Sequence, residues 1–194
     1  MLDVRSLTEE QRRAMDRDME FLAELKKEGC LEEIKDERFS QLAAAGIIAV
    51  TCPDGEHTYD IFGHLCRYNR RIHLPALNGG GMLLSPFNPH FHLEGQALIN
   101  SVAGGWKLGK GKTILLISHW PCGQAHADAY PLAKVLLDTL LADDYITAKL
   151  GVSEEVVLPL FHVDWTPLES VAEAKRRRTY VIKNCARKYI ERHL

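Results

Sequence analysis

The sequence predicts an α/β protein, a three-layer fold built around a mostly parallel β-sheet. Short runs of branched aliphatic residues alternate along the chain with longer segments whose apolar residues recur every three or four positions. The first pattern is typical of strands covered on both faces, and the second is typical of helices that pack on a sheet. At 194 residues the chain is long enough for one substantial core, so we expect a single domain over residues 1–194.

Composition and charge exclude several classes of partner. The hydrophobic content of 46% and the charged content of 26% are ordinary for a globular domain, and the formal net charge of -2 gives no general attraction to nucleic acid or to a membrane surface. No apolar stretch approaches the roughly 20 residues of a membrane span. The first residues are highly charged, unlike a secretory signal, so the expected location is the cytoplasm.

An N-terminal helical extension is expected over residues 1–45. Its first helix, over residues 6–28, is charged except for one apolar stripe: Met15, Met19, Leu22 and Leu25. This stripe can pack on the chain's own core or on a neighbouring subunit, and both alternatives stay open. A second short helix is expected over residues 31–45, followed by Gly46 as its C-cap.

An α/β core is expected over residues 46–165, followed by a C-terminal helix with a basic face over residues 166–194. Aliphatic runs bounded by turn-forming residues predict the strands of the core, at residues 46–52, 71–77, 113–118 and 156–161. Apolar spacing predicts its helices, at residues 59–70, 95–106 and 126–150. The glycine- and lysine-rich segment at residues 109–113 resembles part of a phosphate-binding loop, but it precedes a strand instead of following one. We therefore interpret it as a solvent-facing turn.

Metal-capable side chains follow two of the expected strands. His119 and Cys122 come at the end of the run that begins at Thr113, and Cys52 ends the run that begins at Gly46. Because ligand sites in α/β sheets gather beyond the carboxyl ends of parallel strands, we expect the three side chains to lie together. Two thiolates and one imidazole form the ligand set of catalytic zinc sites that keep a fourth position open for water or substrate. The sequence therefore predicts a Zn²⁺ site at Cys52, His119 and Cys122.

Other residues that could take part in binding or catalysis lie outside this set. A segment with three consecutive glycines lets backbone approach a neighbour closely, and we interpret it as a substrate-contacting loop: Asn78, Gly79, Gly80 and Gly81. Three further cysteines are expected to be inert core residues: Cys30, Cys66 and Cys185. Two polar residues after another strand are expected to have a structural role: His162 and Asp164.

The motifs around the three ligands resemble those of β-class carbonic anhydrases, which carry Cys-x-Asp-x-Arg after one strand and His-x-x-Cys-Gly after a later one. Cys52-Pro-Asp54 and His119-Trp-Pro-Cys122-Gly123 match them in the same order, and the resemblance covers roughly residues 46–165. It implies a β-carbonic anhydrase-like fold with Zn²⁺ as cofactor and Asp54 as the catalytic residue beside the zinc-bound water. The implied activity is that of a lyase of the carbonate dehydratase type. In it, zinc hydroxide attacks carbon dioxide, giving bicarbonate reversibly, or attacks a related small electrophile. The resemblance also implies a homodimer or higher homo-oligomer.

One position departs from the family motif. The family has an arginine two residues after the aspartate, which pairs with that aspartate and holds it off the metal, whereas this chain has Glu56 there. Asp54 can then close the site as a fourth ligand, or a cation from elsewhere can replace the arginine: Arg67, Arg70 or Arg71. A closed site defines the alternative function, a non-catalytic homologue whose zinc is structural.

Overall fold

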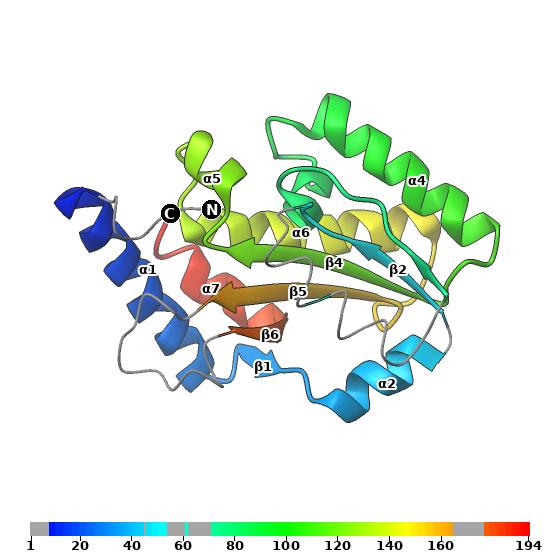
Figure 1. Cartoon of the computed structure of the whole chain (residues 1–194), viewed down its shortest axis with the longest axis horizontal. Helices are drawn as coiled ribbons and strands as arrows, with labels where there is room; N and C mark the ends of the chain where they lie inside the picture. The colour runs from blue at the N-terminus through cyan, green and yellow to red at the C-terminus, as the bar shows by residue number, and fades with distance from the viewer. Residues whose placement is uncertain (1–7, 45, 54–60, 62–70, 165–176) are drawn as a thin grey trace.

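A six-stranded sheet runs through the protein in the order β1-β6-β5-β4-β2-β3 in the computed structural model (Figure 1). The structure describes residues 8–44, 46–53, 61, 71–164 and 177–194. The strands are β1 (Leu31–Glu33), β2 (Ile47–Val50), β3 (Ile72–His73), β4 (Thr113–Trp120), β5 (Val157–Asp164) and β6 (Arg177–Ile182). The four neighbours β3, β2, β4 and β5 are parallel, whereas β6 is antiparallel to both β5 and β1. The predicted α/β class with a mostly parallel sheet is confirmed.

Helices and helical turns connect and cover these strands. The α-helices are α1 (Glu9–Lys27), α2 (Asp36–Ala44), α4 (Gln96–Lys107), α5 (Gly123–Ala127), α6 (Leu132–Leu150) and α7 (Arg187–Ile190). Shorter turns are the 3-10 helices η2 (Gly80–Leu84) and η5 (Asn184–Ala186) and the π-helical turn η3 (Phe91–Gly95). Lys110 and Lys112, in the turn before β4, are exposed, in agreement with a solvent-facing turn.

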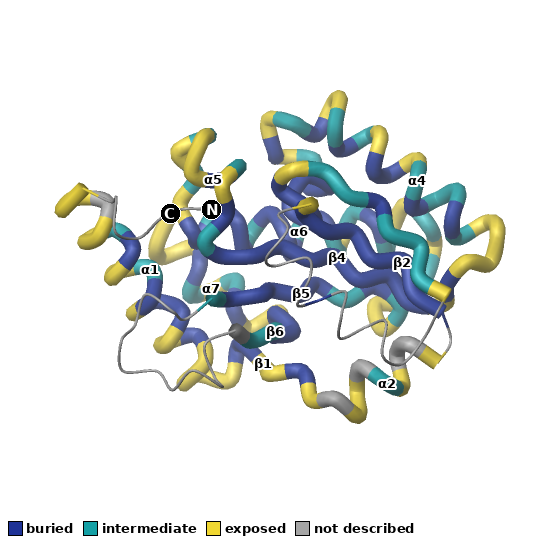
Figure 2. The backbone as a smooth tube through the Cα atoms, viewed as in Figure 1, coloured by how far each residue is buried: buried dark blue, intermediate teal, exposed yellow. Residues whose placement is uncertain are grey.

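The strand β4 forms the centre of the fold and divides the core in two. Every residue of β4 is buried, which is the burial expected of a parallel strand covered on both faces (Figure 2). Ile114 and Leu116 pack with residues of α4 and α6. Leu115 and Ile117 point to the opposite face and pack with residues of β2, β5 and β6. This alternation is compatible with a three-layer arrangement.

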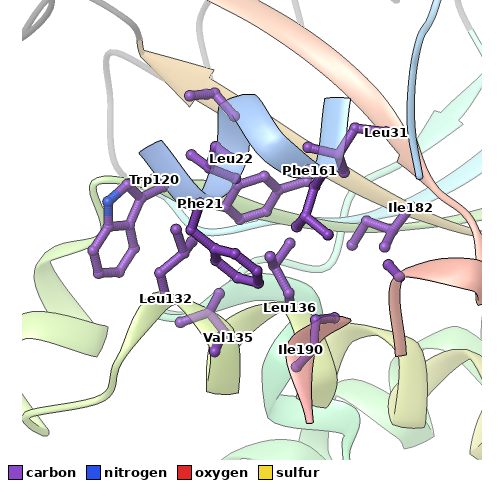
Figure 3. Packing of buried hydrophobic residues seen from close by; sticks show 14 of the residues in the cluster. Phe21, Leu22, Leu31, Trp120, Leu132, Val135, Leu136, Phe161, Ile182 and Ile190 are labelled. Atoms are coloured by element: carbon purple, nitrogen blue, oxygen red, sulfur yellow. The ribbon is translucent and has the colours of Figure 1, made fainter. Parts of the chain in front are cut away.

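Helix α1 packs on the chain's own core. All four residues of its predicted apolar stripe are buried, in one cluster with residues of β5, β6 and α6. Figure 3 shows Phe21 and Leu22 of α1 among Leu136, Phe161 and neighbouring apolar side chains. Of the two alternatives for this helix, packing within the chain is the one observed.

The second short helix, expected over residues 31–45, is present as α2, but its first residues and part of the expected C-terminal helix form strands instead. Residues 31–33, expected to begin a helix, form β1, which pairs with β6. Residues 177–182, expected to lie inside the C-terminal helix, form β6, and α-helix returns only at α7. The segment Thr179-Tyr-Val-Ile182 is rich in residues that favour strands, and the β5 edge provides backbone partners for it. The sheet therefore extends beyond the predicted core at both ends.

Three smaller differences concern helices and one strand. The helix expected at residues 126–150 is divided into α5 and α6 by a turn in which Ala129 has a φ of 53° and Pro131 precedes α6. The buried face of α4 includes Ile99 but not Ala97. Strand β5 runs on to Asp164. Apart from Ile61, the helix expected at residues 59–70 lies outside the described residues.

Substituting Leu22→Ala tests the packing of α1. Leu22 is fully buried, so the free energy of unfolding should fall by about 2–5 kcal/mol, through lost apolar burial and the cavity left behind. Urea denaturation measures this loss, and the exposed Leu108→Ala is the control, with an expected change within about 0.5 kcal/mol. Equal stabilities for the two variants would contradict the packing of α1 on this core.

Candidate metal centre

The register of two parallel strands brings Cys52 close to His119. Strand β2 pairs with β4 so that Val50 lies opposite Leu116. Continuing by two residues places Cys52 level with Ser118, immediately before His119 in β4. The backbone stays ordered past the end of β2 because Thr51 forms a parallel bridge with Ala76. Both side chains therefore lie at the carboxyl end of the sheet, as the strand-end argument predicts.

The three predicted ligands form a compact, buried group. One potential ligand atom each from Cys52, His119 and Cys122 lies within 4.8 Å of the others. The side chains are only 5%, 3% and 2% exposed, respectively. Tetrahedral zinc holds thiolate sulfur at about 2.3 Å and imidazole nitrogen at about 2.0–2.1 Å, so small side-chain shifts would bring all three onto one ion. Across the described residues, no other group of three His, Cys, Asp or Glu residues is placed in this way.

The ring of His119 is oriented by the turn that follows it. Its Nδ1 lies 2.9 Å from the carbonyl oxygen of Pro121. Because a carbonyl oxygen can only accept a hydrogen bond, Nδ1 carries the proton and Nε2 is the nitrogen with a lone pair. This is the tautomer that metal-binding histidines adopt when a backbone carbonyl holds the other ring nitrogen.

The two thiols differ in their readiness to ionise. A hydrogen bond from the Cys122 thiol lowers the pKa of Cys52 to about 4 against the opposing effect of burial. The backbone N–H of Gly79, 3.4 Å from Cys52 Sγ, acts in the same direction. The hydrogen bond to Cys52 and burial raise the pKa of Cys122 well above its usual range. One thiolate is thus already formed at neutral pH, and metal binding would displace the proton of the other.

The glycine-rich segment forms one wall of this centre. Gly80 has a φ of +59°, and a Cβ there would lie 2.5 Å from the oxygen of Ile117 and 2.7 Å from the nitrogen of Cys52. A Cβ at Gly81 would lie 2.8 Å from the nitrogen of Ile117. The expected close approach of backbone to a neighbour is confirmed, and the neighbours are the two strands that carry the ligands. Asn78 is exposed, and contact of this loop with a substrate stays a prediction.

A buried carboxylate anchors the far end of the glycine turn, the segment that runs from Asn78 through η2 to Ser85. This carboxylate was not predicted from the sequence. Asp138 of α6 is fully buried and accepts hydrogen bonds from Ser85 Oγ at 2.9 Å and Asn88 Nδ2 at 3.2 Å. It also accepts from Tyr130 OH at 3.0 Å and Lys134 Nζ at 2.8 Å. These bonds join η2 to α6. The only signal in the sequence is an acidic residue on the otherwise apolar face of a helix.

The remaining residues of interest fall into two groups. Asp54, predicted as the catalytic residue, lies outside the described residues, as do Glu56, Cys66, Arg67 and Arg70. His162 lies within β5 beside His119, and its Nδ1 is 2.9 Å from Thr179 Oγ1, in agreement with a structural role. Asp164 is the last residue of β5 and pairs with Arg177 in the sheet.

Of two further expectations about individual residues, the one for Arg71 stays untested and the one for Cys185 is wrong. The carbonyl of Arg71 accepts the N–H of Ile47 at the amino end of β2, and because Asp54 lies outside the described residues, a role for Arg71 in place of the family arginine stays a prediction. That end is roughly 16 Å of strand away from Cys52. Cys185 is exposed and is not a core residue, although Cys30 is buried as expected.

Comparison with known proteins adds no family assignment. The chain matches no family model, no curated protein and no solved structure. None of the helices within the described ranges is long and apolar enough to cross a membrane. The geometry of the Cys52, His119 and Cys122 group is therefore the basis for any functional conclusion.

Substituting Gly80→Ala tests the fit of the glycine turn against the ligand strands. The added Cβ meets backbone atoms on both strands and a positive φ, so we expect a loss of at least about 2–4 kcal/mol of stability together with weaker metal binding. Gly104→Ala in α4 is the matched control, because a Cβ there has open space, and it should gain about 0.5–1 kcal/mol. Denaturation and zinc titration measure both effects, and an unchanged Gly80→Ala variant would contradict this packing.

Substituting Cys122→Ser tests the ligand set. A hydroxyl does not replace thiolate as a zinc ligand, so zinc affinity should fall by more than about 100-fold. This loss exceeds that expected for a residue that only hydrogen-bonds a ligand without touching the metal. Competition with a chromophoric chelator measures the affinity, and metal analysis measures zinc content. Cys185→Ser, at an exposed thiol outside the group, should keep wild-type zinc. Wild-type zinc in Cys122→Ser would rule this centre out.

Proposed function

We propose that this chain is a zinc enzyme of the β-carbonic anhydrase type that catalyses the reversible hydration of carbon dioxide. The observation that carries the proposal is the buried group of Cys52, His119 and Cys122 at the carboxyl ends of two adjacent parallel strands. Two thiolates and an imidazole suit zinc better than they suit calcium or magnesium, which prefer oxygen ligands. Three protein ligands leave one tetrahedral position for water.

Charge balance supports a small neutral substrate. Two thiolates and a neutral imidazole would neutralise Zn²⁺, so the centre would carry no net charge before reaction. A neutral centre in a buried setting admits an uncharged molecule such as carbon dioxide without the desolvation cost of an ion. The product, bicarbonate, is an anion and gains no net attraction from such a centre, which favours its release. Carbon dioxide and bicarbonate are therefore the proposed small-molecule partners, and a homodimer or higher homo-oligomer belongs to the same proposal.

The residues of the chain have separate tasks in this scheme. Zinc bound there would act as a Lewis acid that lowers the pKa of a coordinated water toward about 7. The Pro121 carbonyl holds the His119 ring, and the Gly79 N–H stabilises the Cys52 thiolate. The backbone of Gly80 packs against the ligand strands and leaves no side chain at that wall. By resemblance, Asp54 would accept a hydrogen bond from the attacking water and so orient it.

A second function is favoured by one observation in the sequence, Glu56 at the position of the family arginine. If no cation lies beside Asp54, its carboxylate is not held away from the metal. A carboxylate as fourth ligand would close the centre and leave no position for water. The protein would then be a non-catalytic homologue in which zinc stabilises the fold.

Stopped-flow hydration of carbon dioxide, on protein of measured zinc content, separates the two functions. The proposed enzyme should contain about one zinc per chain and hydrate carbon dioxide with a rate that rises between about pH 7 and pH 9. Asp54→Asn should lose most of this rate while keeping its zinc. Protein purified anaerobically without any bound metal would contradict both functions.

Substituting Glu56→Arg provides the sharper comparison. If the protein contains about one zinc per chain but does not hydrate carbon dioxide at any pH, the closed centre with Asp54 as fourth ligand is the function supported. In that protein, Glu56→Arg should restore the family pair with Asp54 and produce measurable hydration. Glu56→Gln is the matched control, since it removes the acid without adding a cation, and it should stay inactive. Cobalt-substituted protein reports the change independently, because its visible spectrum depends on the number and type of ligands.

A further inference from the structure

A second pair of cysteines lies in contact away from the metal centre. The Sγ atoms of Cys30 and Cys185 are 2.7 Å apart, although the residues are 155 positions apart in sequence. A disulfide bond is about 2.0 Å long, so these sulfurs are within about 0.7 Å of bonding distance. Two thiols at such a distance need almost no movement of the backbone to become linked.

The backbone around both cysteines is held by the sheet. Cys30 immediately precedes β1, and its N–H bonds the carbonyl of Leu25 at the end of α1. Cys185 lies in η5, just after β6. Strands β1 and β6 are paired, and beyond the end of that pairing the N–H of Lys183 bonds the carbonyl of Cys30 at 2.9 Å. The contact between the sulfurs is thus fixed by the register of two strands.

We propose that Cys30 and Cys185 form a reversible disulfide, a redox modification site that fastens the end of β6 to the junction of α1 and β1. This inference does not depend on the proposed function, since neither residue belongs to the metal centre. The oxidant is a low-molecular-weight disulfide such as glutathione disulfide.

The exposure of the two thiols sets the order of the reaction. Cys185 is exposed, whereas Cys30 is 1% exposed, so the oxidant meets Cys185 first. The Cys185 thiolate attacks one sulfur of glutathione disulfide, which forms a mixed disulfide and releases one glutathione thiolate that takes up the proton lost by Cys185. The sulfur of Cys30 then attacks Cys185 Sγ, and the second glutathione leaves with the proton of Cys30. The protein loses two electrons and two protons, and the oxidant becomes two thiols.

The buried thiol is protected until that first step occurs. Burial and the hydrogen bond with Cys185 raise the pKa of Cys30 to about 12, which keeps Cys30 protonated at neutral pH. Conversion of Cys185 to a mixed disulfide removes one cause of this raised pKa and places the leaving group directly beside Cys30. A soluble reagent that does not first react with Cys185 has no comparable access to the buried Cys30.

Peptide mapping under non-reducing conditions tests the proposal on the full chain as purified. The protein is treated with glutathione disulfide, quenched in acid, blocked with a thiol-alkylating reagent and digested with trypsin. The expected product links the peptide of residues 28–35 to that of residues 184–187, and dithiothreitol should separate them. The oxidised protein should melt roughly 5–15 °C higher, because the cross-link restricts the unfolded chain.

Variants make the outcome specific. Cys185→Ser should give neither the linked peptides nor the rise in melting temperature, whereas the neighbouring Asn184→Ala should give both. Two results would overturn the proposal. One is oxidation that links residues 39–67, which contain Cys52 and Cys66, to residues 113–134, which contain Cys122, while Cys30 and Cys185 stay alkylated. The other is glutathione retained on Cys185 without any link to Cys30.

Discussion

The parallel register between β2 and β4 is the constraint on which the candidate metal centre depends. A slip of one residue would move the end of β2 by about 3.3 Å along β4 and so displace Cys52 from His119. Burial alone does not fix this register, because all residues of β2 are buried and their side chains would be equally buried after a slip. Contacts outside the strands fix it instead. The N–H of Lys112 bonds the carbonyl of Gly46 at one end, and Gly80 fits between the backbones of both strands at the other.

The metal centre and the helical layer are connected through the glycine turn. One end of the turn touches Cys52, and the other end leads to Ser85, which Asp138 holds against α6. A fully buried carboxylate is costly to remove from water, and here four donors, one of them the Lys134 ammonium, compensate for that cost. The three candidate ligands are thus positioned by packing and hydrogen bonds already present in the chain. Such preorganisation reduces the ordering that metal binding must bring about.

Local patterns in the sequence predicted the centre of the fold well and its edges poorly. Strand β4 was predictable because an unbroken apolar run that ends in His119 has few other interpretations. The same rule, applied to Cys52, correctly predicted that the three candidate ligands lie together. Strand β1 was missed because it becomes a strand by pairing with β6, far along the chain, whereas β6 was missed although its residues favour strands. The contact of Cys30 with Cys185 follows from the same long-range pairing, so it was equally hidden, and Asp54 lies outside the described residues.

The pairing of β1 with β6 also determines the order in which the chain can fold. Leu31 finds its partner Ile182 only after roughly 150 further residues have been made, which takes about 8–30 s of synthesis. During that interval α1 has its apolar face without β6 and α7, the elements that help to bury it. Helix α1 therefore completes its packing late, and a chain interrupted before residue 177 would leave part of that face uncovered for chaperones and proteases.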